Sequence, residues 1–205
     1  MQICNGKGQA VIEKCSGNIQ DICETIYNDT ENFPMPEDVY LGMDIIEHAY
    51  NYFKENGSSL SNESEDIRKK TLTAFALPKN IAGLERDLAK YRITYDNWFK
   101  ESTLHNDGSV NEIIQKLKAS GYTYEQDGAL WFKSSQLGDE KDRVLIRANG
   151  VVTYFVPDIA YHYNKLVTRG YDKAIDIFGA DHHGYIPRMK AALTALGVDA
   201  NKLDI

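Results

Sequence analysis

Residues 175–184 read Ile-Asp-Ile-Phe-Gly-Ala-Asp-His-His-Gly, and this stretch decides the fold. Its apolar beginning is typical of a short strand, and its two glycines allow a tight turn to follow. Apolar residues then recur at helical spacing from Ile186 to Leu196, which predicts a helix. A strand, a turn and a helix in this order indicate an α/β fold, in which ligands bind beyond the carboxyl ends of the strands. The polar residues of the turn are therefore the first candidates for a functional site.

The polar turn allows three interpretations. Asp176, Asp181, His182 and His183 could hold a metal ion in a hydrolase, since carboxylate and imidazole groups bind Zn, Fe or Mn. The turn could instead bind adenosine, with its glycines admitting the ligand close to the backbone and Asp181 accepting hydrogen bonds from the ribose. It could also be a solvated loop, because short motifs often match by chance. No H-E-x-x-H pattern supports the metal site, so the rest of the chain must decide.

Composition narrows the class of protein. The 205 residues carry a formal net charge of -7, which argues against a surface devoted to nucleic acid but allows a local basic patch. The three cysteines, all near the start, form no C-x-x-C pair and no even-numbered disulfide framework. We therefore expect a reducing, cytoplasmic setting. The sequence has no signal peptide and no apolar run long enough to cross a membrane, so we expect no membrane partner.

The chain divides into three expected segments. Residues 1–91 are predicted to be mainly helical, residues 92–156 to contain a strand, a helix and β-hairpins, and residues 157–205 to contain the strand, turn and helix described above. The helices expected in the first two segments span 1–30, 42–53, 63–77, 80–91 and 110–120. Pro78 is expected to separate two of them, and Ser109 with Glu112 forms a capping-box pattern before the last.

Strands are expected where apolar and aromatic residues alternate. The predicted strands span 92–99, 122–125, 129–133, 143–147 and 151–156, and a helix over 158–168 follows them. Asp-Gly at 127–128 and Asn-Gly at 149–150 are strong hairpin signals. The middle of the chain should therefore be a small antiparallel β region.

Asp158 stands at the predicted start of the helix after the β region. A carboxylate at that place is favoured by the helix dipole alone. It could also face the end of the sheet and bind a cation, with the hydroxyl of Tyr154 adding a hydrogen bond. A carboxylate beside a phenol suits a guanidinium group, whose planar fork a carboxylate matches with two parallel hydrogen bonds.

Several ordered motifs resemble the bacterial arginyl-tRNA synthetases, which are class I enzymes. The resemblance is collinear from about residue 40 to residue 197, and it is specific as a set although each motif alone is weak. Its main motifs are Asp-Asn-Trp-Phe-Lys-Glu at 96–101, Asp-Gly-Ala-Leu-Trp at 127–131, Asp-Arg-Val-Leu-Ile-Arg at 142–147, Thr-Tyr-Phe at 153–155, Asp-Ile-Ala-Tyr-His at 158–162 and Gly-Ala-Asp-His-His-Gly-Tyr at 179–185.

The resemblance implies an α/β fold, namely a partial Rossmann-like nucleotide-binding domain with helical and β-hairpin insertions. It implies a family that activates L-arginine with ATP and then charges tRNA, with Mg²⁺ accompanying the ATP. Tyr154, Asp158 and Asp181 match residues on the arginine side of the site. Gly179, Asp181, His182 and His183 match the turn that contacts adenosine.

Two family motifs are missing from these residues. Neither the His-x-Gly-His motif nor the Lys-Met-Ser-Lys-Ser loop occurs, and both help to stabilise charge at the α-phosphate. We expect the first to precede Met1 and the second to follow Ile205. The chain is therefore expected to be a piece of the catalytic core that is inactive alone and that contains no catalytic residue of its own. A synthetase-like binding module without catalysis is the remaining alternative.

Overall fold

The computed structural model describes residues 42–60, 62–179 and 184–205. The chain forms two compact units, Met1–Asp96 and Asn97–Ile205, and each is described here by itself. The helix expected over 1–30 lies outside the described residues. None of the helices in the described ranges is long and apolar enough to cross a membrane.

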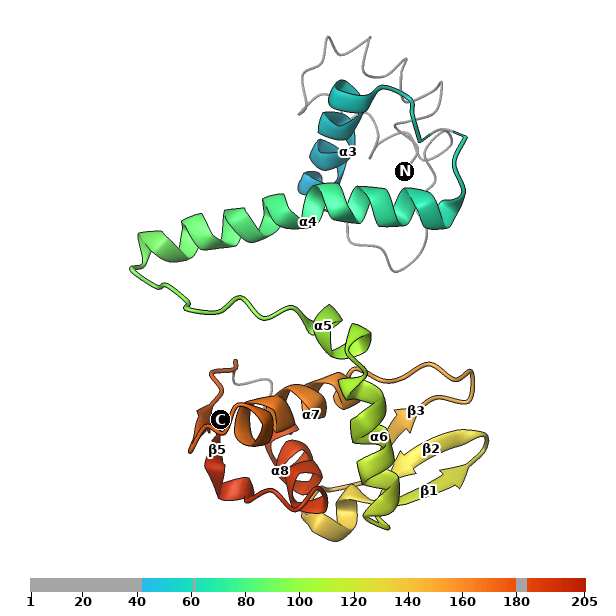
Figure 1. Cartoon of the computed structure of the whole chain (residues 1–205), viewed down its shortest axis with the longest axis vertical. Helices are drawn as coiled ribbons and strands as arrows, with labels where there is room; N and C mark the ends of the chain where they lie inside the picture. Colours follow the sequence, from blue (N-terminus) through green and yellow to red (C-terminus); the bar gives the residue numbers. More distant parts are fainter. Residues whose placement is uncertain (1–41, 61, 180–183) are drawn as a thin grey trace. The chain divides into compact units, whose positions relative to one another are not determined.

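Two helices build the described part of the first unit (Figure 1). Helix α3 spans Met43–Asn56 and helix α4 spans Glu65–Lys90. They pack through a small cluster of Tyr52, Leu60 and Leu72, with the ring of Phe75 meeting that of Tyr52 edge to face. The prediction of a helix over 42–53 is confirmed, with one further turn at its end.

The predicted break at Pro78 is wrong. Pro78 lies inside the continuous helix α4. A proline there removes one backbone hydrogen bond and strains the preceding turn, but it does not forbid the helix. Good helix formers on both sides and a Ser64 cap, whose hydroxyl accepts from the amide of Ile67, keep the helix whole.

The strand predicted over 92–99 is also absent from the structure. The segment is irregular up to Lys100, and Ile93 and Tyr95 are exposed. Alternating aromatic residues form a strand only where a neighbouring strand supplies hydrogen bonds, and no described strand pairs with this segment.

Two short helices open the second unit. Helix α5 spans Glu101–Asn106 and was not predicted. Helix α6 spans Ser109–Ala119, close to the predicted 110–120. The predicted capping box does not form, because Ser109 is the first helical residue and Gly108 precedes it in the left-handed region. Asp107 accepts from the amide of Ser109 instead, at 2.8 Å, and Glu112 pairs forward with Lys116.

A three-stranded antiparallel sheet follows, in the order β1-β2-β3. The strands span Thr123–Gln126, Ala129–Phe132 and Arg143–Ile146, and the 3-10 turn η2 at Ser134–Leu137 joins the last two. Asp127 and Gly128 both have positive φ, as the predicted tight hairpin requires. The last predicted strand, 151–156, is reduced to a single bridge from Val152 to Ile146, because the chain turns into a helix at Phe155.

A helix and then a parallel strand–helix–strand unit complete the chain. Helix α7 spans Phe155–Tyr163 and continues as a π-helical turn, η3, over Asn164–Thr168. Strand β4, Ala174–Ile175, pairs in parallel with β5, Leu203–Asp204. Helix α8, Tyr185–Ala195, and the short turn η5, Ala200–Lys202, lie between these strands in the sequence. This arrangement agrees with the predicted α/β class, although β4 is shorter than expected and Ile177 beyond it is exposed.

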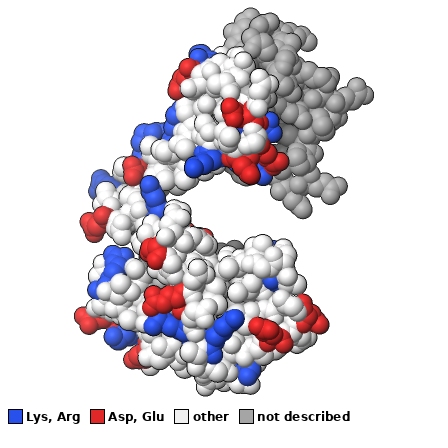
Figure 2. Space-filling model, turned by 45° about the vertical axis from the view of Figure 1, so that its right-hand side comes forward, with Lys and Arg blue, Asp and Glu red and all other residues white. Residues whose placement is uncertain are grey.

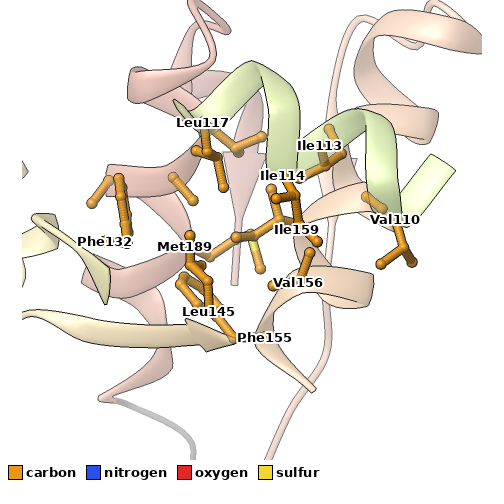
Figure 3. Close-up of a cluster of buried hydrophobic side chains, with 14 of the residues drawn as sticks. Val110, Ile113, Ile114, Leu117, Phe132, Leu145, Phe155, Val156, Ile159 and Met189 are labelled. Carbon is orange, nitrogen blue, oxygen red and sulfur yellow. The ribbon is translucent and has the colours of Figure 1, made fainter. Parts of the chain in front are cut away.

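One apolar core holds the second unit together (Figure 3). Side chains from α6, from β2 and β3, from α7 and from α8 point toward one another in it. The labelled members are Val110, Ile113, Ile114, Leu117, Phe132, Leu145, Phe155, Val156, Ile159 and Met189. Because α7 and α8 share this core, the polar residues at their beginnings are held on a rigid base.

Candidate functional site

The first turn of α7 is anchored to the sheet by Thr153. Its amide donates to the carbonyl of Leu145 at 2.9 Å, and its hydroxyl donates to the carbonyl of Val144 at 2.8 Å. Pro157 follows as the third residue of the helix. The amides of the first turn have no partner inside the helix, so a proline there costs no hydrogen bond. The proline beside Asp158 is thus compatible with a regular backbone.

Asp158 lies in this first turn and is partly buried. Its carboxylate accepts a hydrogen bond from the hydroxyl of Tyr185, the first residue of α8. Burial raises the pKa of the Asp158 carboxyl, and the nearby charges of Glu101 and Asp176 act in the same direction. The hydrogen bond from Tyr185 and the charge of His162 oppose this rise. The result is a carboxylate that would gain from a cationic ligand.

Tyr185 is held in place by its neighbours. Its ring meets the ring of Phe178 edge to face, with 5.4 Å between the centroids. Burial, followed by the charge of Asp158, raises the pKa of the Tyr185 hydroxyl far above its usual range. Tyr185 therefore stays neutral and acts as a hydrogen-bond donor to Asp158.

Tyr154, the residue before α7, is 65% exposed. Its hydroxyl accepts a hydrogen bond from a terminal nitrogen of Arg188 at 3.1 Å. The guanidinium of Arg188 also lies over the ring of Phe155, 5.8 Å from its centroid. The phenol bonded to Asp158 is therefore that of Tyr185, and sequence reasoning missed both Tyr185 and Arg188. Their only signal was their position in the first turn of the helix after the glycine-rich turn.

A buried polar cluster adjoins Asp158. The carboxylate of Asp176, just beyond β4, accepts from the ammonium of Lys165 at 2.7 Å and contacts Nε2 of His162 at 2.5 Å. Nδ1 of His162 lies 2.7 Å from the backbone carbonyl oxygen of Asp158. The cluster ties the end of β4 to helix α7.

The remaining predicted site residues belong to the turn before α8. Gly179 is exposed in the irregular segment after Asp176. Asp181, His182 and His183 lie outside the described residues. Gly184, which precedes α8, has φ of -69°, an ordinary helical value, so its backbone conformation does not require a glycine.

The metal-site interpretation can be examined at Asp176. Both oxygens of this carboxylate are already engaged by His162 and Lys165. Among the residues that the structure describes, no group of three or more His, Cys, Asp or Glu side chains is arranged to hold a metal ion. The side chain of Asp176 is therefore part of a charge cluster with His162 and Lys165, and the other residues of the metal interpretation, 181–183, lie outside the described ranges.

Comparison with known proteins decides the family. The family model described as the catalytic domain of class I tRNA synthetases for arginine matches residues 8–205. The chain belongs to this family. The arginine–tRNA ligase of Acetivibrio thermocellus is 51% identical over 170 residues, which are 83% of this chain and 30% of that protein. The enzyme of the same name from Ruminiclostridium cellulolyticum is 45% identical over 194 residues, 95% of this chain and 34% of that protein.

Solved structures agree with this assignment. A structure described as that of an arginyl-tRNA synthetase from Campylobacter jejuni is 38% identical, with a TM-score of 0.75 over 91% of this chain and 42% of that one. The enzyme from Plasmodium falciparum, 17% identical with a TM-score of 0.60, shares the fold. The chain spans about a third of the length of the curated relatives described above, so it is a fragment of an arginyl-tRNA synthetase catalytic domain. The class I synthetase fold and the family predicted from the motifs are confirmed, and the hydrolase alternative is not supported.

Proposed function

We propose that this fragment forms the arginine and adenosine side of the active site in an enzyme that attaches L-arginine to its tRNA at the expense of ATP. The observation that carries the proposal is the partly buried Asp158, whose carboxylate accepts from the neutral hydroxyl of Tyr185 and, among the described residues, makes no ion pair with a lysine or arginine. A guanidinium matches a carboxylate with two parallel, charge-assisted hydrogen bonds. The family of the chain points to arginine as the ligand.

Tyr154 and Asp181 complete the proposed arginine subsite. Tyr154 is an exposed residue, and its hydroxyl, which accepts from Arg188, can accept from the ligand in the same way. Asp181 is assigned by its match to the family motif. Recognition by a carboxylate and hydroxyls distinguishes arginine from citrulline, which has a similar shape without the charge.

The adenosine subsite is proposed at Gly179, Asp181, His182 and His183. The support is the match to the glycine-containing turn of the family together with the position of the turn, between strand β4 and helix α8. A helix N-terminus beyond a parallel strand is the usual place for a nucleotide in such folds. Mg²⁺ is expected to arrive with the phosphates of ATP.

tRNA is the third proposed partner. On the face of the molecule shown in Figure 2, blue and red side chains are interspersed over the described residues and do not gather into one broad basic surface. A contact of tRNA with this face is therefore expected to be local. The cytoplasmic location remains a prediction.

The proposal can be tested in a chimera. The matching segment of the Acetivibrio thermocellus ligase is replaced by this sequence, and arginine-dependent exchange of pyrophosphate into ATP is measured with tRNA present. The expected result is exchange with arginine and none with citrulline or lysine. A folded chimera that binds arginine but shows no pyrophosphate exchange would favour the non-catalytic binding module. A folded chimera that does not bind arginine would contradict the proposal.

A further inference from the structure

Arg188 is a half-buried cation whose charge is not matched by a carboxylate of the fold. It lies in the first turn of α8, and a terminal nitrogen donates to the neutral hydroxyl of Tyr154 at 3.1 Å. Within the described ranges, Arg188 makes no salt bridge with an Asp or a Glu. Charges removed from water are normally paired, so an arginine bonded to a phenol requires an explanation.

Two other cations of the second unit show the usual pairing. The guanidinium of Arg143 donates from two nitrogens to the two oxygens of Asp139, each at 2.7 Å. The ammonium of Lys165 donates to the carboxylate of Asp176, also at 2.7 Å. The fold neutralises both of these charges and leaves that of Arg188 for a ligand.

The guanidinium of Arg188 is fixed in position. It lies over the ring of Phe155, 5.8 Å from the centroid, which is within the range of a cation–π contact. Phe155 itself is buried in the apolar core of the second unit. Stacking uses the face of the guanidinium and leaves the N–H groups in its plane free to donate. A cation held in this way loses little conformational entropy when it binds a ligand.

The terminal nitrogens are the part of Arg188 that a ligand can reach. Nε is buried and has no hydrogen-bond partner, so this edge of the guanidinium is closed. The two terminal nitrogens lie side by side in a planar fork, which matches two oxygens of a carboxylate or a phosphate. The bond to Tyr154, a residue of the proposed arginine subsite, places such an anion next to that subsite.

We propose that the terminal nitrogens of Arg188 bind an oxyanion of a substrate, either the carboxylate of the amino acid or a phosphate of the nucleotide. The identity of the substrate rests on the proposed function. The anion site itself follows from a guanidinium that is fixed by Tyr154 and Phe155 and unmatched in charge.

The anion site can be tested on the unmodified chain. Nitrogen-15 NMR of labelled arginine follows the Nε signal of Arg188, which is assigned by its loss in Arg188→Lys. The chain is titrated with inorganic pyrophosphate and with acetate, and at least one of them should shift the signal in a saturable way. Sodium chloride at matched ionic strength should not. No saturable shift with either anion, or an equal shift with sodium chloride, would overturn the proposal.

The source of the oxyanion is identified in the chimera with Arg188→Met. If Arg188 binds the carboxylate of the amino acid, the variant should bind L-arginine about 10- to 100-fold more weakly and agmatine, which lacks the carboxylate, equally well. If it binds a phosphate, the variant should lose the same factor for ATP and none for adenosine. Arg188→Lys, which keeps the charge but not the planar fork, serves if Arg188→Met does not fold.

Arg169→Met is the matched control. Arg169 also donates to a tyrosine hydroxyl, that of Tyr171 at 2.7 Å, and also lies over an aromatic ring. It follows the π-helical turn η3 and is exposed, so its loss should leave all four affinities unchanged. An equal loss of affinity in Arg169→Met and Arg188→Met would mean that net charge, and not a site at Arg188, attracts the anion.

The outcomes separate this inference from the proposed function. Selective loss of carboxylate-dependent or phosphate-dependent affinity in a chimera that binds arginine would support both proposals. A saturable pyrophosphate shift in a chain whose chimera never binds arginine would keep the anion site and reject the function. Unchanged affinity of Arg188→Met for all four ligands, in a chimera that binds arginine, would keep the function and overturn the anion site.

Discussion

The hydroxyl of Tyr185 donates a hydrogen bond to the carboxylate of Asp158, so the first residue of α8 is tied to the first turn of α7. The two helices share one apolar core and are joined again at this polar contact. The contact orients the carboxylate without neutralising its charge. A ligand that brings a positive charge can therefore still gain from binding there.

Tyr185→Phe should weaken this arrangement. The variant keeps the ring that contacts Phe178 but removes the donor to a partly buried carboxylate, which should cost about 1–3 kcal/mol of stability. Urea unfolding measures the loss. Tyr154→Phe is the matched control, because its hydroxyl is on an exposed residue and bonds to Arg188, so it should change stability by less than about 0.5 kcal/mol. Equal effects of the two variants would contradict the assigned role of Tyr185.

Asp139→Asn should destabilise the second unit more strongly than Tyr185→Phe does. Asp139 is fully buried as a side chain and accepts two hydrogen bonds from Arg143, both at 2.7 Å. Removing its charge leaves a largely buried guanidinium unpaired, at a cost of about 3–5 kcal/mol. Lys173→Met, which breaks an exposed pair, should cause no measurable loss in the same urea titration. A small effect of Asp139→Asn would mean that Arg143 finds another partner.

The same pair predicts how stability changes in acid. Burial by itself would raise the pKa of Asp139, but the hydrogen bonds from Arg143, Ser134 and the backbone outweigh it and lower the pKa. A lowered pKa contributes stability that is complete above the unfolded value of about 3.9 and is lost as pH falls through the folded value. The contribution of Asp139, measured as the difference in unfolding free energy from Asp139→Asn, should shrink below about pH 4. A difference that stays constant down to pH 2 would contradict this account.

Pro78→Ala should stabilise helix α4. The substitution supplies the missing amide donor in the helix interior and removes the clash of the proline ring, which together are worth up to about 3 kcal/mol. Circular dichroism during urea unfolding measures the change. Pro157→Ala is the matched control, since a proline in the first turn of α7 replaces no helical hydrogen bond and its removal should bring no gain. Equal gains from both substitutions would show that position within the helix is unimportant.

Much of the fold follows from local sequence patterns. The apolar periodicity of α3, α6 and α8 and the Asp-Gly turn between β1 and β2 predicted these elements correctly, since each pattern forms its structure with near neighbours. The failures depend on distant contacts. The strand predicted over 92–99 has no described partner, and the strand predicted over 151–156 ends where Phe155 enters the core as a helical residue.

In the candidate site, too, the sequence predicted the local features and missed those that depend on distant contacts. Asp158 was predicted at a helix start because its motif is local. The donor Tyr185 and the cluster of His162, Lys165 and Asp176 come from separate elements, and only the folded chain brings them together. The residues 181–183, which lie outside the described ranges, remain assigned by their motif.

The chain without added segments should not form arginyl-adenylate at a measurable rate. Neither phosphate-stabilising motif occurs in its 205 residues, and the loss of one such preorganised donor costs about 10²–10³ in rate. Arginine-dependent pyrophosphate exchange with tRNA present measures this, and the active chimera described above is the control. Pyrophosphate exchange by the chain alone at the rate of the chimera would contradict the claim that the two missing motifs are needed for activity.

The central claim is that Asp158 recognises the guanidinium of arginine, and titration of the Asp158→Asn chimera with arginine and with ATP tests it most directly. Asparagine keeps the size and polarity but removes the charge, so arginine binding should weaken by about 2–5 kcal/mol while ATP affinity stays nearly unchanged. A carboxylate that merely stabilises the start of α7 predicts a loss of about 1 kcal/mol or less in stability and no change in either affinity. Unchanged arginine affinity with a lowered melting temperature would contradict the account.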